Sequence, residues 1–117
     1  MKNRILLLDD DTIVLESFKY MMSRYNYGVS IYSDVKKCLD DIKDNDYSLI
    51  LTDIRMPKID GSEFVREVLK IRPDSYIYLL TSYPEDNIVK TALELGAKGL
   101  MEKPFQLSKI ISIMNRL

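Results

Sequence analysis

The chain has 117 residues, a formal net charge of −1 at pH 7, one cysteine and no histidine. This length suits one domain with a substantial core, so residues 1–117 are interpreted as a single unit. The near-neutral charge argues against direct binding of nucleic acid or an anionic membrane surface, and no apolar stretch reaches the roughly 20 residues of a membrane span. A lone cysteine, Cys38, cannot form an internal disulfide, which fits the cytoplasm; we interpret it as a small buried residue.

Short apolar segments alternate with amphipathic ones five times along the chain. We expect strands over about 4–8, 29–32, 49–53, 75–80 and 99–102. Helices are expected over about 12–25, from an N-cap at Ser33 or Asp34 to 43, from an N-cap at Ser62 to 71, over 84–96 and over 107–117. Apolar strands joined through helices by short connections predict a doubly wound (βα)5 fold, with a parallel sheet covered on both faces.

The first predicted helix has a broad apolar face, and acidic residues precede it. The apolar positions are Ile13, Val14, Leu15, Phe18, Met21, Met22 and Tyr25. Asp11 is interpreted as the N-cap, because aspartate is favoured there and its charge suits the helix dipole.

Polar side chains stand where four of the predicted strands end. Asp9 and Asp10 follow the first strand, Asp53 ends the third, Thr81 and Ser82 follow the fourth, and Lys103 follows the fifth. The carboxyl ends of parallel strands meet at one edge of the sheet, where ligands bind in such folds. We therefore predict a site containing at least three carboxylates and one ammonium group.

The acidic groups of this predicted site favour a hard divalent cation. Adjacent carboxylates at Asp9 and Asp10 repel each other unless a cation or a proton is shared between them. Mg²⁺ takes one or two carboxylates together with water and phosphate oxygens, whereas zinc prefers histidine and cysteine ligands. Asp53 is the candidate nucleophile for a phosphoryl group, and Lys103 supplies a cation that can stabilise the transferring charge.

Each of these residues also has an ordinary structural explanation. Acids after a strand often cap a helix, Asp53 could be a turn residue, and the segment from Lys103 to Phe105 could be a simple loop. The coincidence of all these residues at matched strand ends favours the functional interpretation.

Four motifs over the whole chain resemble those of receiver domains of bacterial two-component response regulators. They are Leu8-Asp9-Asp10-Asp11, Thr52-Asp53-Ile54-Arg55-Met56-Pro57 with Asp60-Gly61, Leu80-Thr81-Ser82-Tyr83, and Glu102-Lys103-Pro104-Phe105. The resemblance implies the flavodoxin-like receiver fold, with strand order 2-1-3-4-5. It also implies that Asp53 accepts phosphate, and that Asp9, Asp10, Asp53 and the backbone carbonyl of Arg55 hold Mg²⁺ or Mn²⁺.

The resemblance further assigns a switch. Thr81 would be the switch hydroxyl, and Lys103 would bind phosphate, with a cis peptide before Pro104. Leu100 departs from the family pattern, because receivers usually carry tyrosine or phenylalanine there. We therefore expect the switch to work through the fourth helix and its loop. Tyr83 is interpreted as a surface aromatic, with a substitute switch role as the alternative.

A receiver of this kind is a phosphoacceptor signalling module. The resemblance implies a sensor histidine kinase or phosphotransfer protein as phosphoryl donor, and an effector or output domain controlled by the surface of the fourth helix, fifth strand and fifth helix. It implies self-catalysed, Mg²⁺-dependent phosphorylation and dephosphorylation without turnover of an external substrate, and a phosphorylation-dependent homodimer as one output. The alternative is the N-terminal receiver of a longer DNA-binding regulator. Lys98 and Gly99 replace two acids common in receivers of winged-helix regulators, which argues against that subclass.

Two other function classes fit the sequence less well. A phosphatase of the haloacid dehalogenase type needs Asp-x-Asp-x-Thr, but in Asp9-Asp10-Asp11-Thr12-Ile13 the threonine stands one place too early. A nucleotide-binding module of the doubly wound class needs a glycine-rich phosphate loop, and the sequence contains neither G-x-G-x-x-G nor G-x-x-x-x-G-K.

Overall fold

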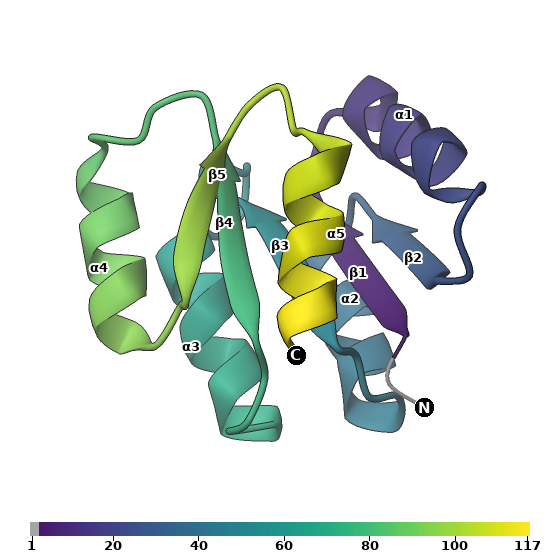
Figure 1. Ribbon diagram of the computed structural model, residues 1–117. Coiled ribbons are helices and arrows are strands. Elements are labelled where there is room, and N and C mark those ends of the chain that lie inside the picture. Colours follow the sequence, from purple (N-terminus) through teal and green to yellow (C-terminus); the bar gives the residue numbers. More distant parts are fainter. Residues whose placement is uncertain (1–2) are drawn as a thin grey trace.

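The computed structural model describes residues 3–117, which form a five-stranded parallel sheet with helices on both faces (Figure 1). The strands are β1 (Arg4–Leu8), β2 (Gly28–Tyr32), β3 (Leu49–Asp53), β4 (Ile77–Thr81) and β5 (Gly99–Glu102). The helices are α1 (Thr12–Met22), α2 (Val35–Asp44), α3 (Gly61–Ile71), α4 (Asn87–Leu95) and α5 (Leu107–Arg116). The strand order β2-β1-β3-β4-β5 confirms the predicted flavodoxin-like topology. Within the described residues, no helix has the length and apolar character needed to cross a membrane.

Two apolar cores lie on opposite faces of the sheet, because successive strand residues point to opposite sides. Leu6 and Leu8 of β1 pack with α2, α3 and α4, whereas Ile5 and Leu7 pack with α1 and α5. Cys38 of α2 is fully buried in the first of these cores, which confirms its interpretation as a core residue. Burial raises the pKa of its thiol well above the usual range.

Helix α1 is shorter than predicted and buries a narrower face. It ends at Met22 instead of Tyr25, and the Ser23 hydroxyl donates a hydrogen bond of 2.6 Å to the Tyr20 carbonyl. A serine that bonds the preceding turn competes with continuation of the helix. Of the seven predicted apolar positions, those that are buried are Leu15, Phe18 and Met22, while those that are exposed are Ile13, Met21 and Tyr25.

Two other helices begin at different residues from those predicted. Asp60, not Ser62, is the N-cap of α3, and its carboxylate accepts a hydrogen bond of 3.0 Å from the Glu63 backbone N–H. Asp86 is the N-cap of α4, so the helix begins at Asn87 and not near Pro84. In each case the aspartate has extended backbone, as an N-cap requires, and the chain becomes helical directly after it.

Strand β4 is shifted towards the carboxyl end relative to the predicted range of 75–80. It begins at Ile77 because Ser75 still belongs to a turn, in which its N–H donates to the Arg72 carbonyl. It extends to Thr81, which pairs with Glu102 of β5. The shift places Thr81 at the last position of the strand.

Candidate functional site

The four predicted strand ends lie together at the carboxyl edge of the sheet. Asp9 directly follows β1, Asp53 ends β3, Thr81 ends β4 and Lys103 directly follows β5. These strands are successive neighbours in the sheet, as the arrowheads in Figure 1 indicate. The fold therefore brings residues from four separate parts of the sequence to one site.

Three carboxylates form the acidic cluster, which we define as Asp9, Asp10 and Asp53. Each offers a carboxylate oxygen, and these oxygens lie within 4.8 Å of one another. Asp9 is fully buried and Asp53 is 9% exposed, whereas Asp10 is open to solvent. Charges at this spacing repel strongly when two of them are buried, so the arrangement suits a bound cation.

Lys103 lies inside the site and faces both buried acids. Its Nζ is 2.9 Å from Asp9 Oδ2 and 3.4 Å from Asp53 Oδ2. The lysine was predicted beside Asp53, and it lies even closer to Asp9. Among the described residues this ion pair is the only close polar contact of Asp9 Oδ2, which is buried and accepts no hydrogen bond of good geometry.

The buried Asp9 Oδ2 supports the predicted metal, because it accepts no hydrogen bond from the described residues and its residue belongs to the acidic cluster. All three side-chain donors are carboxylates, and a hard oxygen set of this kind fits Mg²⁺ or Mn²⁺ better than zinc. Asp10, on the solvent side, leaves room for the water that Mg²⁺ retains.

The site shifts the protonation of its central groups. Burial raises the pKa of Asp53 from its usual 3.8 to about 6, the nearby Asp9 charge adds to the rise, and Lys103 partly offsets it. Burial disfavours the Lys103 ammonium, but contacts with Asp9 and Asp53 outweigh that cost, so the pKa of Lys103 is raised. At neutral pH the site therefore holds an ionised Asp53 opposed by a charged lysine.

The β3–α3 loop holds the Asp53 carboxylate in place. The Ile54 backbone N–H donates a hydrogen bond of 2.8 Å to Asp53 Oδ1. The loop then folds back, so that the Gly61 N–H donates to the Ile54 carbonyl at 2.8 Å. A Cβ at Gly61 would lie 2.9 Å from Ile54 Cα and 3.0 Å from the Asp53 carbonyl oxygen. Only glycine permits this approach without a shift of the backbone.

Asp9 is held by two hydrogen bonds to residues that follow it in the sequence. Its backbone N–H donates to the Tyr32 carbonyl at 3.0 Å, and its Oδ1 accepts from the Asp11 N–H at 2.9 Å. Asp11 is the N-cap of α1, as predicted. The hydroxyl groups of Tyr32 and Tyr47 both donate to the Asp41 carboxylate, which ties the end of β2 and the segment before β3 to α2. These contacts fix the backbone on which Asp9 depends.

Thr81 is almost fully buried at the site, and its hydroxyl is already engaged. Its Oγ1 accepts a hydrogen bond of 2.8 Å from the Tyr83 N–H, and its carbonyl accepts one of 2.8 Å from the Lys103 N–H. Tyr83 is 68% exposed, which agrees with a surface aromatic. Leu100 of β5 is half-buried and packs on the core beneath α4, and the peptide between Lys103 and Pro104 is cis, as expected.

One contact at the site was not predicted. The Arg55 Nε–H donates a hydrogen bond of 2.8 Å to Asp86 Oδ2, and a terminal guanidinium nitrogen forms an ion pair with the same oxygen at 2.7 Å. The sequence argument considered only the backbone carbonyl of Arg55. An aspartate just before a helix signals an N-cap, but nothing in the sequence pairs it with an arginine 31 positions away.

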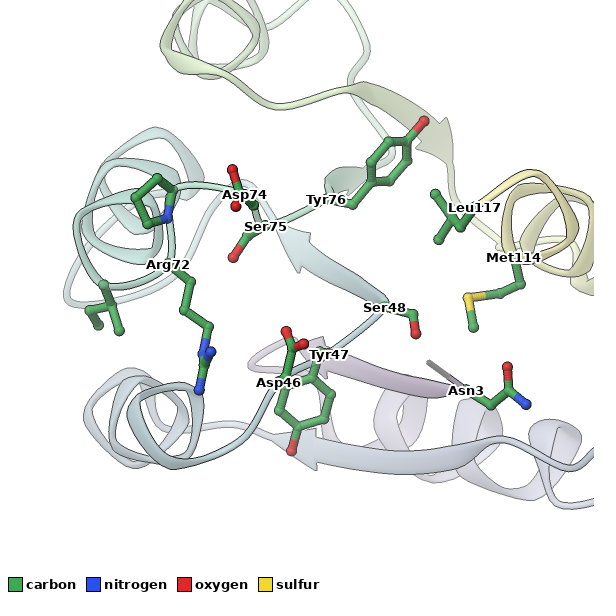
Figure 2. A pocket seen from close by; sticks show the side chains of 12 residues that line it. Asn3, Asp46, Tyr47, Ser48, Arg72, Asp74, Ser75, Tyr76, Met114 and Leu117 are labelled. Carbon is green, nitrogen blue, oxygen red and sulfur yellow. The ribbon is translucent and has the colours of Figure 1, made fainter. Parts of the chain in front are cut away.

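A pocket of about 650 Å³ lies at the opposite edge of the sheet from the acidic cluster (Figure 2). The labelled side chains come from the segments that precede strands, such as Ser48 before β3 and Tyr76 before β4, and from the end of α5. None of the acidic or basic groups described above lines this pocket, so it is separate from the candidate site.

The family of the chain follows from a comparison with known proteins. A family profile described as the response regulator receiver domain matches residues 5–115. The chain belongs to this family. At the strand ends this receiver domain carries aspartate at positions 9, 10 and 53, threonine at 81 and lysine at 103.

The relatives of this receiver domain include proteins about twice its length and proteins of about the same length. It is 32% identical over 117 residues to the response regulator MprA of Mycobacterium sp. (strain KMS), covering the whole chain but only 51% of MprA. It is 25% identical to the chemotaxis protein CheY of Thermotoga maritima, covering the whole chain and 98% of CheY. Thus it spans about half the length of MprA and of the transcriptional regulatory protein FixJ of Bradyrhizobium diazoefficiens.

A solved structure agrees with these relatives. The crystal structure of a CheY-like receiver domain protein from Methanospirillum hungatei JF-1 has a TM-score of 0.89 and 29% identity, and the match covers 99% of this chain and 96% of that one. The receiver fold thus extends over nearly all of the described residues.

Proposed function

We propose that this receiver domain takes a phosphoryl group onto Asp53 in the presence of Mg²⁺, with a sensor histidine kinase or a phosphotransfer protein as donor. The observation that carries the proposal is the acidic cluster, whose three carboxylates converge within 4.8 Å and face Lys103. A carboxylate nucleophile, a cation opposite it and a set of hard oxygen ligands are the groups that phosphoryl transfer to aspartate needs.

In the proposed reaction an Asp53 carboxylate oxygen attacks phosphorus. The new P–O bond forms as the bond to the phosphohistidine nitrogen breaks, and the electron pair leaves with the imidazole. When bound, Mg²⁺ neutralises charge on the transferring group. Lys103 offers a second positive charge, and the Thr81 hydroxyl can donate to a phosphoryl oxygen once it turns towards Asp53. Water later cleaves the acyl phosphate and restores the carboxylate, so no external substrate is turned over.

The output of the domain is proposed to be a change in the surface formed by α4, β5 and α5, read by an effector, an output domain or a second copy of the chain. Coverage of only about half of MprA and FixJ favours a second proposal, in which this is the N-terminal receiver of a longer DNA-binding regulator. The Thermotoga CheY matches the chain over 98% of its own length, so domains of this kind occur in proteins of either size. The chemistry at Asp53 is the same in both.

Incubation with acetyl phosphate tests the proposed function. The wild-type protein should gain the mass of one phosphoryl group when Mg²⁺ is present and none when EDTA removes the metal. Asp10→Ala should need a higher Mg²⁺ concentration, because it removes one of the three ligands while leaving the nucleophile intact. Intact-protein mass spectrometry measures both effects, and equal labelling in EDTA would contradict the proposal.

A leucine at position 100 leads us to expect a switch without a moving aromatic ring. Leu100→Ala should lower the free energy of unfolding by about 1–2 kcal/mol, since the side chain is half-buried. A side chain that packs alike in both states biases neither, so the response of α4 to a phosphate mimic should persist.

Hydrogen exchange of α4 amides, with and without beryllofluoride and Mg²⁺, measures that response. Leu69→Ala is the matched control, because Leu69 packs on the same core but lies on α3. Loss of the response in Leu100→Ala alone would show that the leucine belongs to the switch.

A further inference from the structure

The Arg55–Asp86 pair joins the two loops that border the candidate site. Arg55 lies in the β3–α3 loop, two residues after Asp53, and Asp86 is the N-cap of α4 at the end of the β4–α4 loop. The Arg55 side chain is 66% exposed, whereas that of Asp86 is 9% exposed. The pair is the only ion pair between these two loops among the described residues.

Both ends of this pair are tied to groups of the site. Asp86 Oδ1 accepts a hydrogen bond of 2.9 Å from the Ile88 N–H, and Asp86 Oδ2 pairs with the Arg55 guanidinium. The Asp86 N–H donates to the Tyr83 carbonyl at 3.1 Å, and the Tyr83 N–H donates to Thr81 Oγ1 at 2.8 Å. A continuous series of contacts therefore runs from the loop after Asp53, through the N-cap of α4 and the β4–α4 loop, to the Thr81 hydroxyl.

We propose that Arg55 is a positioning residue that couples metal binding at the acidic cluster to the N-terminus of α4 through its ion pair with Asp86. The inference rests on the proposed function, together with the role that the family resemblance implies for the Arg55 backbone carbonyl as a further Mg²⁺ ligand. A carbonyl held by a cation restricts the residue that carries it, so less conformational entropy remains to be lost when the Arg55 side chain binds Asp86. Coupling between two sites is reciprocal. The ion pair must therefore raise the affinity for Mg²⁺ by the same factor by which bound Mg²⁺ raises the equilibrium constant of the ion pair.

A double-mutant cycle on Mg²⁺ affinity separates this coupling from simple charge effects. The four proteins are the wild type, Arg55→Gln, Asp86→Asn and the double variant, each titrated with Mg²⁺ alone by calorimetry. Asparagine retains N-cap function, so Asp86→Asn removes the charge without removing the cap of α4. Asp34→Asn is the control, because Asp34 caps α2 in the same way and has no arginine partner among the described contacts.

We expect Asp86→Asn to weaken Mg²⁺ binding more in the wild type than in Arg55→Gln, by a further factor of about 1.5 to 5, the range of exposed ion pairs. Mg²⁺ should also slow hydrogen exchange of the Ile88 N–H in the wild type but not in Arg55→Gln. Asp34→Asn should leave Mg²⁺ affinity unchanged.

The coupling would be overturned if Asp86→Asn weakened Mg²⁺ binding equally in the wild type and in Arg55→Gln. It would also be overturned if Mg²⁺ did not change hydrogen exchange of the Ile88 N–H in the wild type. If Mg²⁺ binds the wild type and binds Asp10→Ala more weakly, such a result counts against the coupling alone. A wild-type protein that takes up no Mg²⁺ would overturn the proposed function together with this inference.

Discussion

Asp53→Asn should abolish phosphoryl uptake and at the same time stabilise the metal-free protein. Uptake is lost because an amide cannot replace the carboxylate nucleophile. The gain in stability follows from the pKa of Asp53, which burial and Asp9 raise from 3.8 to about 6. At neutral pH the folded protein carries an ionised group that its surroundings disfavour, and the amide removes that charge at similar volume.

The pH dependence of this gain has a defined sign. A carboxyl whose folded-state pKa is raised costs stability above that pKa, and the cost disappears as pH falls below the unfolded value. The free energy of unfolding of Asp53→Asn should therefore be about 1–3 kcal/mol higher than that of the wild type above pH 6. This difference should shrink as the pH falls towards 4. Thermal or urea unfolding in EDTA across this range measures it, and mass spectrometry with acetyl phosphate measures uptake.

Asp60→Asn is the matched control for this substitution. Asp60 lies in the same loop, but although burial opposes its ionisation, hydrogen bonds from Ser62 and Glu63 lower its pKa. The control should give no gain in stability and should retain phosphoryl uptake. A wild-type level of uptake in Asp53→Asn would refute the assignment of the nucleophile, and destabilisation at pH 7 would refute the electrostatic argument.

The sheet and the acidic cluster were predictable because both depend on short, local patterns. Strands β1 and β3 contain the apolar runs Ile5-Leu6-Leu7-Leu8 and Leu49-Ile50-Leu51, which lead to Asp9 and Asp53, and both runs are buried on both faces as such strands require. Once five such segments are arranged in parallel, their carboxyl ends must share one edge. The position of the candidate site therefore followed from the order of residues along the chain.

The details that were wrong or missing depend on backbone conformation and on distant contacts. Aspartate and serine both cap helices, so the choice of Asp60 over Ser62 was decided by which residue has extended backbone. The ion pair between Arg55 and Asp86 joins residues 31 positions apart, and no periodicity reports on it. The closer approach of Lys103 to Asp9 reflects the complete burial of a carboxylate that has no other close polar contact for one of its oxygens.

Lys103→Met should destabilise the metal-free protein and make its stability depend more strongly on Mg²⁺. Methionine keeps an unbranched side chain but removes the ammonium that faces Asp9 and Asp53. Two buried carboxylates then remain without a cation, which should lower the free energy of unfolding by roughly 1–3 kcal/mol, given that the lysine side chain is 20% exposed.

Mg²⁺ supplies positive charge to the same carboxylates, so the stability difference from the wild type should narrow as Mg²⁺ is added. The variant should bind Mg²⁺ more tightly than the wild type, because no lysine competes for Asp9. Lys98→Met is the control, since Lys98 lies just before β5 at the other edge of the sheet, near the Tyr76 ring. Lys98→Met should change neither the dependence of stability on Mg²⁺ nor the affinity for Mg²⁺.

Phosphorylation should remain measurable in Lys103→Met, because Asp53 and the acidic cluster are intact, but it should no longer alter hydrogen exchange in α4 and β5. The wild-type lysine must leave Asp9 or Asp53 to meet the phosphoryl group, and this movement acts on β5, whose end directly precedes it. A Lys103→Met protein that is as stable as the wild type in EDTA would refute the role of the ammonium in balancing the two acids. An exchange response equal to that of the wild type would refute its role in coupling phosphorylation to the surface of the domain.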